Sequence, residues 1–382
     1  MNKDAMYPAK ILFRPNNVEW KQENRIWQGI PGIERTSNGR LYATWYTGGV
    51  TEEPGNIVLL EKSDDDGRTW TDCFIVVWHE NPEIRCFDEC IWIDPLGRLW
   101  LFWMQAPQIL DAKAGVWCAV CDNPDADQPV FGEIRRIADG VMLNKPIVTK
   151  DGRWLFPCAV WRDGLARSTP AYPELEGKRL ASVVESGDEG RTFTWLGGAN
   201  VPNRWFHEHN IVELNDGRLW MLVRTSYGLG QAFSSDGGIT WTEQGDSGHT
   251  GPNSRCFLRR LASGRLLLIN HVNPTYRTNP KDWNVRNNLM ALLSEDDGKT
   301  WIGGLMLDTR NEVSYPDGVQ AENGDIYIIY DFQRYKSREI LLAVFREEDV
   351  LEGRLVSPNA RLKQRINQAT GGTQGALPLD PA

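Results

Sequence analysis

One short motif recurs six times along the chain and restricts the folds that the chain can adopt. Each copy has a glycine, then Arg or Asp, then a run of apolar and aromatic residues, as in NGRLYATW and DGRLWMLV. The six glycines, 47 to 65 residues apart, are Gly39, Gly97, Gly152, Gly217, Gly264 and Gly324. A turn glycine followed by such a run is typical of a tight hairpin that leads into a buried strand. Six hairpins at intervals long enough for four short strands predict a protein built from repeated β-sheets.

A second repeat lies between the copies of the first and reads Ser-x-Asp-x-Gly-x-Thr-aromatic. Its four copies are SDDDGRTW (63–70), SGDEGRTF (186–193), SSDGGITW (234–241) and SEDDGKTW (294–301). The aspartate can accept hydrogen bonds from turn amides, the glycine suits a left-handed conformation, and the aromatic ring packs between strands. We therefore assign these boxes to structure. The segment CDNPDADQPVFG (121–132) stands where a further copy is expected and has lost the motif.

The two repeats run in phase, and together they predict an all-β, six-bladed β-propeller with almost no helix over residues 1–360. We expect the segment AKILFRP (9–15) to pair with the last blade and close the ring, because an open ring leaves unpaired strand edges. Residues 361–382 turn rich in Gly, Pro and Ala. They are predicted to form a tail that is disordered or that contacts a partner.

Composition excludes several classes of function. The chain has 42 basic and 51 acidic residues and no basic run, which argues against nucleic acid and anionic membranes as partners. No apolar stretch approaches the length of a membrane span, and the first residues lack the pattern of a secretory signal. The seven cysteines have no disulfide-framework spacing, which favours reduced thiols and a cytoplasmic location. Cys118 and Cys121 lie in a strand-like run, where positions three apart face opposite ways, so no metal or other cofactor is predicted.

The start of each innermost strand supplies the candidate site. In a propeller this strand precedes the first hairpin turn of its blade, and its start faces the central channel. Nine residues before the turn glycines lie Ile30, Asp88, Leu143, Glu208, Arg255 and Tyr315. Four of the six are ionisable or phenolic and stand in apolar surroundings, a set that suits a glycosidase for an acidic sugar. The alternative is a set of buried charges that pair for structural reasons.

Asp boxes on a six-bladed propeller resemble the sialidase (neuraminidase) superfamily, and the similarity extends over roughly residues 20 to 350. The resemblance implies that Tyr315, in VSYPDGVQ, is the nucleophile and that Glu208, in HEHNIVEL, activates it. The anomeric carbon of such a substrate carries a carboxylate, so a phenol deprotonated only as the bond forms is a better nucleophile than a carboxylate. Arg224 and Arg286 match the second and third of the three arginines that hold the substrate carboxylate in this family. Surface salt bridges are the alternative role for both arginines.

The chain departs from the family pattern at two places. The motif that begins with the first arginine reads GIPGIERT here, with Gly29 in the place of that arginine, and Arg25 is the nearest upstream residue able to compensate. The stretch that carries the acid/base aspartate reads YTGGVTEEPGNIV, where neither Glu52 nor Glu53 aligns cleanly. Asp88 is therefore the best acid/base candidate.

The remaining candidates for substrate binding are polar residues near strand ends. They are Arg85, Arg255, His207, His209 and His271. Strand alternation places His207 and His209 on the face opposite to Glu208, which leaves packing between blades as their alternative role.

Three functions remain after these arguments. The first is a sialidase-like exo-glycoside hydrolase that acts on a terminal acidic sugar through the pair Tyr315 and Glu208. The second is a polysaccharide lyase directed at uronates, in which Tyr315 or a histidine removes the proton beside the carboxylate. The third is a propeller that binds glycans or proteins without catalysis. The expected partner is a carbohydrate with a carboxylate group, and a homo-oligomer is left open.

Overall fold

Strands dominate the computed structural model, which describes residues 3–107, 113–161, 172–204, 206–273, 275–276, 278–279, 282 and 284–372. These residues form six separate antiparallel sheets, and strands that follow one another in the chain pair with one another. In every sheet the strand before the repeated glycine turn lies at one edge. Six such sheets are the blades of a six-bladed β-propeller, so the predicted fold class is confirmed.

The described residues group into two compact units. The first unit, residues 1–137, 316–344 and 361–382, holds the first, second and sixth sheets. The second unit, residues 138–315 and 345–360, holds the third, fourth and fifth sheets. The first residues of the sixth sheet, including Tyr315, belong to the second unit.

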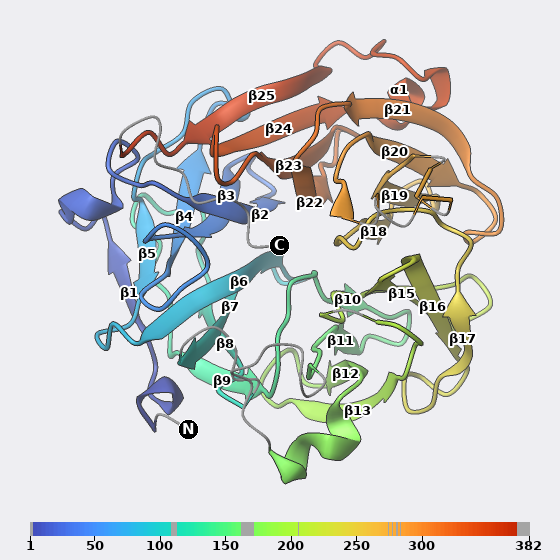
Figure 1. Cartoon of the computed structure of the whole chain (residues 1–382), viewed down its shortest axis with the longest axis horizontal. Helices are drawn as coiled ribbons and strands as arrows, with labels where there is room; N and C mark the ends of the chain where they lie inside the picture. Colours follow the sequence, from blue (N-terminus) through green and yellow to red (C-terminus); the bar gives the residue numbers. More distant parts are fainter. Residues whose placement is uncertain are drawn as a thin grey trace. The chain divides into compact units, whose positions relative to one another are not determined.

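The sheets of the first unit can be followed by their labels in Figure 1. The first contains β1 (Lys10–Phe13), β2 (Gln28–Arg35), β3 (Leu41–Thr47), β4 (Ile57–Ser63) and β5 (Ile75–Trp78). The second contains β6 (Ile84–Ile93), β7 (Leu99–Pro107), β8 (Val116–Cys121) and β9 (Arg135–Ala138). The sixth contains β22 (Val313–Gln320), β23 (Ile326–Phe332), β24 (Glu339–Phe345) and β25 (Arg361–Gln368). Two short 3-10 helices, η1 (Lys3–Met6) and η2 (Val18–Trp20), accompany them.

The sheets of the second unit have four strands each. The third contains β10 (Ile147–Val148), β11 (Trp154–Phe156), β12 (Ala181–Ser186) and β13 (Thr194–Ala199). The fourth contains β14 (Asn210–Glu213), β15 (Leu219–Thr225), β16 (Gly228–Ser234) and β17 (Thr242–Asp246). The fifth contains β18 (Phe257–Arg260), β19 (Leu266–His271), β20 (Leu289–Ser294) and β21 (Ile302–Asp308). The helices here are η3 (Pro173–Lys178) and α1 (Glu347–Glu352), and no helix in the described part of the chain is long and apolar enough to cross a membrane.

Both sequence repeats have the geometry that the sequence predicts. All six turn glycines have positive φ angles, between 80° and 98°. In the box of the fourth sheet, Ser234 Oγ donates to Asp236 Oδ1 at 2.8 Å, and the amide and hydroxyl of Thr240 donate to the same carboxylate. The hydrogen bonds from Thr240 lower the pKa of Asp236 to about 2. The other three boxes repeat these bonds. The boxes therefore stabilise turns, and their aspartates accept hydrogen bonds from the turn itself.

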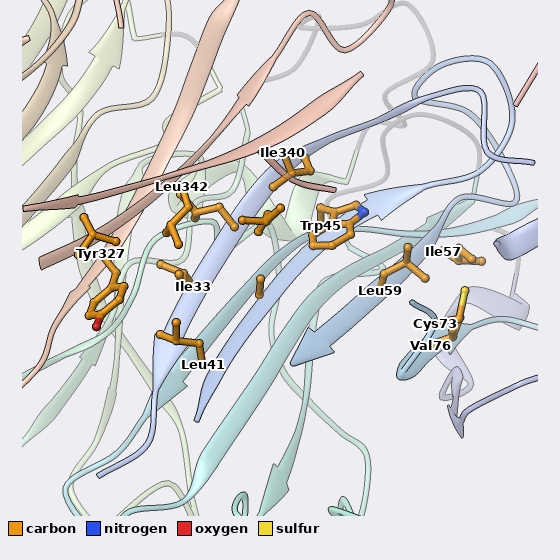
Figure 2. Packing of buried hydrophobic residues seen from close by; sticks show 14 of the residues in the cluster. Ile33, Leu41, Trp45, Ile57, Leu59, Cys73, Val76, Tyr327, Ile340 and Leu342 are labelled. Carbon is orange, nitrogen blue, oxygen red and sulfur yellow. The ribbon is translucent and has the colours of Figure 1, made fainter. Parts of the chain in front are cut away.

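Apolar side chains from neighbouring sheets form the core of each unit. In the first unit, Trp45 and Ile33 from the first sheet pack with Tyr327, Ile340 and Leu342 from the sixth, as Figure 2 shows. In the second unit, one cluster joins the third and fourth sheets and another joins the fourth and fifth. Burial of these flat apolar faces is the main source of stability in such sheets, and it fixes where each innermost strand starts.

Two predictions about the chain ends are wrong. The strand β1 pairs with β5, the outer strand of the first sheet, and not with the last blade. The sixth sheet needs no strand from the N-terminus, because residues 361–368 form its fourth strand, β25, paired with β24. The predicted tail therefore does not begin at residue 361. Residues 373–382 lie outside the described residues.

Candidate active site

The segment that carries Glu208 leaves the regular strand geometry. Phe206 and His207 both have positive φ angles, 57° and 51°, just before β14 begins at Asn210. A left-handed conformation is unfavourable for residues other than glycine, and it survives where the surroundings hold it in place. Here the indole of Trp161 donates a hydrogen bond to the carbonyl oxygen of Phe206. Simple alternation therefore does not decide which way Glu208 and the two histidines point.

Glu208 and Tyr315 meet in the second unit, as the sequence predicts. The Tyr315 hydroxyl donates to Glu208 Oε1 at 2.9 Å, and both side chains are buried, with exposed fractions of 5% for Tyr315 and 7% for Glu208. The other carboxylate oxygen, Glu208 Oε2, is buried and has no hydrogen-bond partner. Tyr315 also has a positive φ angle of 55°. A phenol hydrogen-bonded to a carboxylate with one unused oxygen is an arrangement suited to proton transfer.

Arg224, at the end of β15, joins both members of this pair. Its Nη1 donates to Glu208 Oε1 at 2.7 Å and to the Tyr315 hydroxyl at 2.9 Å, while its Nε donates to Asn253 Oδ1 at 2.7 Å. Burial lowers the pKa of Arg224, but the neighbouring Glu208 and Tyr315 outweigh that effect and raise it. The guanidinium of Arg224 therefore stays charged beside the phenol.

Two further arginines approach the ring of Tyr315. Arg286 donates through Nη2 to the carbonyl oxygen of Asn253 at 3.1 Å, and its Cζ lies 5.2 Å from the centre of the ring. Arg255 is almost fully buried, and its Cζ lies 5.3 Å from the same centre. Its Nη1 donates to the carbonyl oxygen of Leu143 and its Nη2 to that of Tyr315. Arg255 donates to backbone carbonyl oxygens and is closed to solvent, contacts that favour a role within the protein over the predicted role in substrate binding.

The histidines differ in what they contact. Both ring nitrogens of His209 face backbone carbonyl oxygens, of His207 at 2.7 Å and of Ser182 in the third sheet at 2.8 Å, so His209 packs between blades rather than towards a substrate. Burial lowers the pKa of His209, while the two carbonyl oxygens raise it. His271 is fully buried at the end of β19, with Nδ1 at 2.8 Å from the Asn287 carbonyl oxygen.

A small cavity lies beside Glu208. Its volume of about 10 Å³ is close to the room that one water needs. His207, Asn144 and Glu208 are among the residues that line it. His207 therefore lies near the Glu208 carboxylate, as a substrate-binding residue would. Asn144 donates through Nδ2 to the His209 carbonyl oxygen at 2.9 Å.

The candidates Asp88 and Arg85 lie in the first unit. Asp88 is 7% exposed and has a positive φ angle of 49°, where the pairing of β6 with β7 is interrupted between Phe87 and Cys90. Arg85 is fully buried, and its Cζ lies 3.7 Å from the centre of the Phe87 ring. The roles predicted for these two residues, as acid/base and as substrate ligand, stay predictions.

In the first unit, the side chain of Arg334 lies over Gly29, the position of the missing arginine. A Cβ atom at Gly29 would lie 2.5 Å from Cδ of Arg334, so the side chain of Arg334 fills the space where a side chain of residue 29 would start. Arg334 donates through Nε to Asp331 Oδ2 at 2.7 Å, and its Nη1 lies 3.6 Å from Glu52 Oε1. The guanidinium of Arg25, the upstream residue that could compensate, is bound to Asp72, Asn367 and the Trp20 carbonyl oxygen.

Two residues of these clusters were missed from the sequence. Asn253 lies two positions before Arg255, so a search around each counted-back position would have found it. Arg334 lies in the connection between β23 and β24, and no sequence pattern points to it, because its importance depends on the space above Gly29.

The cysteines and acidic residues are the side chains that could bind a metal ion. All seven cysteines are free and buried, and burial raises the pKa of the Cys118 thiol to about 12. One group of three potential ligands occurs among the described residues, namely Glu61, Asp72 and Cys73. The oxygens of Glu61 already accept hydrogen bonds from the amides of Cys73 and Phe74. This donor set is therefore explained by the local backbone.

Fold and site together define a six-bladed propeller with a buried tyrosine–glutamate pair surrounded by arginines. The sequence profile of the BNR repeat-like domain matches residues 39–328, which is more than half of the chain, and the chain belongs to this family. A comparison with curated protein sequences gives no match.

Several solved structures share the fold. A Hadza microbial sialidase is similar with a TM-score of 0.61 and 17% identity, over 85% of this chain and 66% of that one, so this chain spans slightly less than two thirds of that sialidase. The intramolecular trans-sialidase from Ruminococcus gnavus in complex with oseltamivir carboxylate has a TM-score of 0.62 and 13% identity, over 92% of this chain and 99% of that one. A protein of unknown function from Dyadobacter fermentans has a TM-score of 0.57 and 17% identity, over 86% of this chain and 95% of that one. At such identities the similarity establishes the fold alone.

Proposed function

We propose that this protein is a sialidase-like exo-glycoside hydrolase that acts on a terminal sugar bearing a carboxylate at its anomeric carbon. The observation that carries the proposal is the hydrogen bond of 2.9 Å from the Tyr315 hydroxyl to Glu208 Oε1, with Arg224 bound to both groups. The sialidase and the trans-sialidase among the similar folds are consistent with it.

The proposed reaction has two steps. In the first, Glu208 takes the phenolic proton of Tyr315 as the phenolate oxygen bonds to the anomeric carbon, and the leaving oxygen departs with a proton from the acid, for which Asp88 is the candidate. In the second, water attacks the anomeric carbon and gives a proton to the carboxylate that acted as acid, while the tyrosine oxygen leaves and takes back the proton held by Glu208. Arg224 and Arg286 neutralise the sugar carboxylate and the phenolate. Because the anomeric carbon is displaced twice, its overall configuration is retained.

The function is tested with the purified full chain and a panel of aryl glycosides of acidic sugars, with nonulosonic and hexuronic acids included. Release of the aryl group, with retained configuration by NMR, is expected for at least one nonulosonic acid. A 2,3-difluoro analogue of that sugar is expected to label Tyr315, as read by mass spectrometry of peptides. Tyr315→Phe serves as the control and takes no label.

Two outcomes would contradict the proposal. Products that absorb like unsaturated uronates, formed from polysaccharides and not from aryl glycosides, would assign the propeller to the lyase class. Binding of the sugars without turnover or label would assign it to the binding proteins.

A further inference from the structure

Arg255 contacts the proposed nucleophile from a buried position. Its side chain reaches from the segment before β18 to two carbonyl oxygens, of Leu143 at 2.7 Å and of Tyr315 at 3.0 Å. Only 1% of Arg255 is exposed, so a substrate has no access to its guanidinium. The effect of this charge must therefore be exerted on the residues around it.

The residue that Arg255 holds is in a conformation that needs support. Tyr315 has a φ angle of 55° and precedes a proline, Pro316, which restricts its backbone further. The bond from Arg255 Nη2 to the Tyr315 carbonyl oxygen fixes the peptide that follows this strained residue. Arg255 therefore helps to hold the backbone that carries the phenol.

The charge of Arg255 also lies close to the phenol. Its Cζ is 5.3 Å from the centre of the Tyr315 ring. Charged groups that also contact Tyr315 include Glu208 and Arg224 at the hydroxyl and Arg286 at the ring. A positive charge near the ring favours the ionised form of the phenol, and burial reduces the screening of that effect.

We propose that Arg255 is a positioning residue for Tyr315, which holds its left-handed backbone and stabilises the phenolate formed when Glu208 takes the proton. The inference rests on the proposed function only in one respect, namely that the phenolate attacks the sugar. The ionisation of Tyr315 can be measured without a substrate.

The test follows the ionisation of a fluorinated tyrosine at position 315. Incorporation of 3,5-difluorotyrosine at this single site lowers the pH at which the phenol ionises and gives a ¹⁹F NMR signal that reports its charge. Arg255→Gln removes the charge and keeps hydrogen-bonding capacity, whereas Arg255→Lys keeps the charge. We expect the ionisation midpoint to rise by about 1 to 2 pH units in Arg255→Gln and to stay near the unsubstituted value in Arg255→Lys.

Arg338 provides a matched control for a purely structural effect. It is also buried, 5% exposed, and donates to two backbone carbonyl oxygens, of Ile26 at 3.0 Å and Gly371 at 2.8 Å. Arg338→Gln is expected to lower the melting temperature and to leave the ¹⁹F midpoint of residue 315 unchanged. Equal midpoints in Arg255→Gln and Arg255→Lys would overturn the inference.

The remaining outcomes are also decisive. If Arg255→Gln does not fold, Arg255→Lys decides alone: an unchanged midpoint supports the inference, and a midpoint moved to higher pH by more than one unit refutes it. If the midpoints behave as expected but no acidic sugar is turned over, the proposed function fails and the effect of Arg255 on Tyr315 stands. If sugars are turned over and the midpoints do not separate, the function stands and the inference fails.

Discussion

The two units use buried carboxylates in different ways. In the first unit, Asp331 Oδ2 accepts a hydrogen bond from the Ile30 amide at 2.8 Å, and Asp317 Oδ2 accepts one from the Ile33 amide at 2.9 Å. These bonds brace the irregular strand β2. In the second unit, Glu208 accepts from a phenol and a guanidinium, and its second oxygen is unused. The two units therefore differ in the donors that their buried carboxylates accept from, and the phenol beside Glu208 is the arrangement suited to proton transfer.

Backbone strain alone does not make this distinction. Ile30, Asp88 and Tyr315 occupy equivalent counted-back positions, and all three have positive φ angles between 49° and 62°. Ile30 is apolar and has no chemical role, so a positive φ angle at this position, found in three of the six blades, does not by itself indicate catalysis. A role in catalysis must be argued from the side chain that the blade presents there.

The largest expected effect is on the tyrosine–glutamate pair. Glu208→Gln keeps the shape of the side chain but removes the base, so turnover of a competent substrate should fall about 10²- to 10⁴-fold. Turnover of Tyr315→Phe should fall at least as far, and turnover of the double variant little further, because the two groups act as one unit. Melting temperature should hardly change or should rise. A large loss of melting temperature with unchanged turnover of the folded fraction would place Glu208 with the bracing carboxylates.

Asp88→Asn tests whether the first unit also contributes chemistry. If Asp88 is the acid, turnover of glycosides with poor leaving groups should fall about 10²-fold or more, and glycosides with acidic phenol leaving groups should be affected much less. The measurement is a series of aryl glycosides of graded leaving-group acidity. A uniform loss across the series would assign Asp88 to structure.

A smaller effect is expected from Arg334, which fills the space over Gly29. If this arginine binds the sugar carboxylate, Arg334→Ala should raise KM by roughly 10- to 100-fold, the worth of a charged hydrogen bond. Gly29→Ala should displace Arg334 and raise KM as well. In a double-variant cycle, Gly29→Ala should add little once Arg334 is absent. Additive effects of the two substitutions would contradict this relation.

The smallest effect concerns pH and a carboxyl group in the first sheet. Burial raises the pKa of Glu61 from its usual 4.5 to about 7. Below pH 4.5 the folded and unfolded chains both hold this proton, between the two values only the folded chain does, and above about 7 neither does. The contribution to stability is therefore complete at low pH and lost as the pH rises to about 7. Scanning calorimetry should show a decrease of melting temperature in this window that Glu61→Gln abolishes, with turnover unchanged.

The sequence predicted those features that depend on local patterns. The turn glycines and the Asp boxes determine their own hairpins, so blade number and strand order followed from spacing. Counting back from the glycines also identified Tyr315 and Glu208 as neighbours, because every blade presents the same register. The chain ends were predicted wrongly, since tertiary packing decides whether β1 pairs with the edge of the first sheet or with that of the last. The backbone partners of His209 and Arg255 and the place of Arg334 over Gly29 were not predicted for the same reason: each depends on carbonyl oxygens or space on another segment.

The arginine over Gly29 has a consequence for how such chains are classified. Comparison by aligned columns would record a glycine at position 29 and score the motif as lost. In the structure the side chain of Arg334, from the connection after β23, occupies the space over Gly29, with its Cδ 2.5 Å from the place of a Cβ atom. Its long side chain allows the charge to be supplied from a different stretch of the polypeptide. Searches for family members with degraded motifs should therefore compare the positions of charged groups in space before they discard a sequence as inactive.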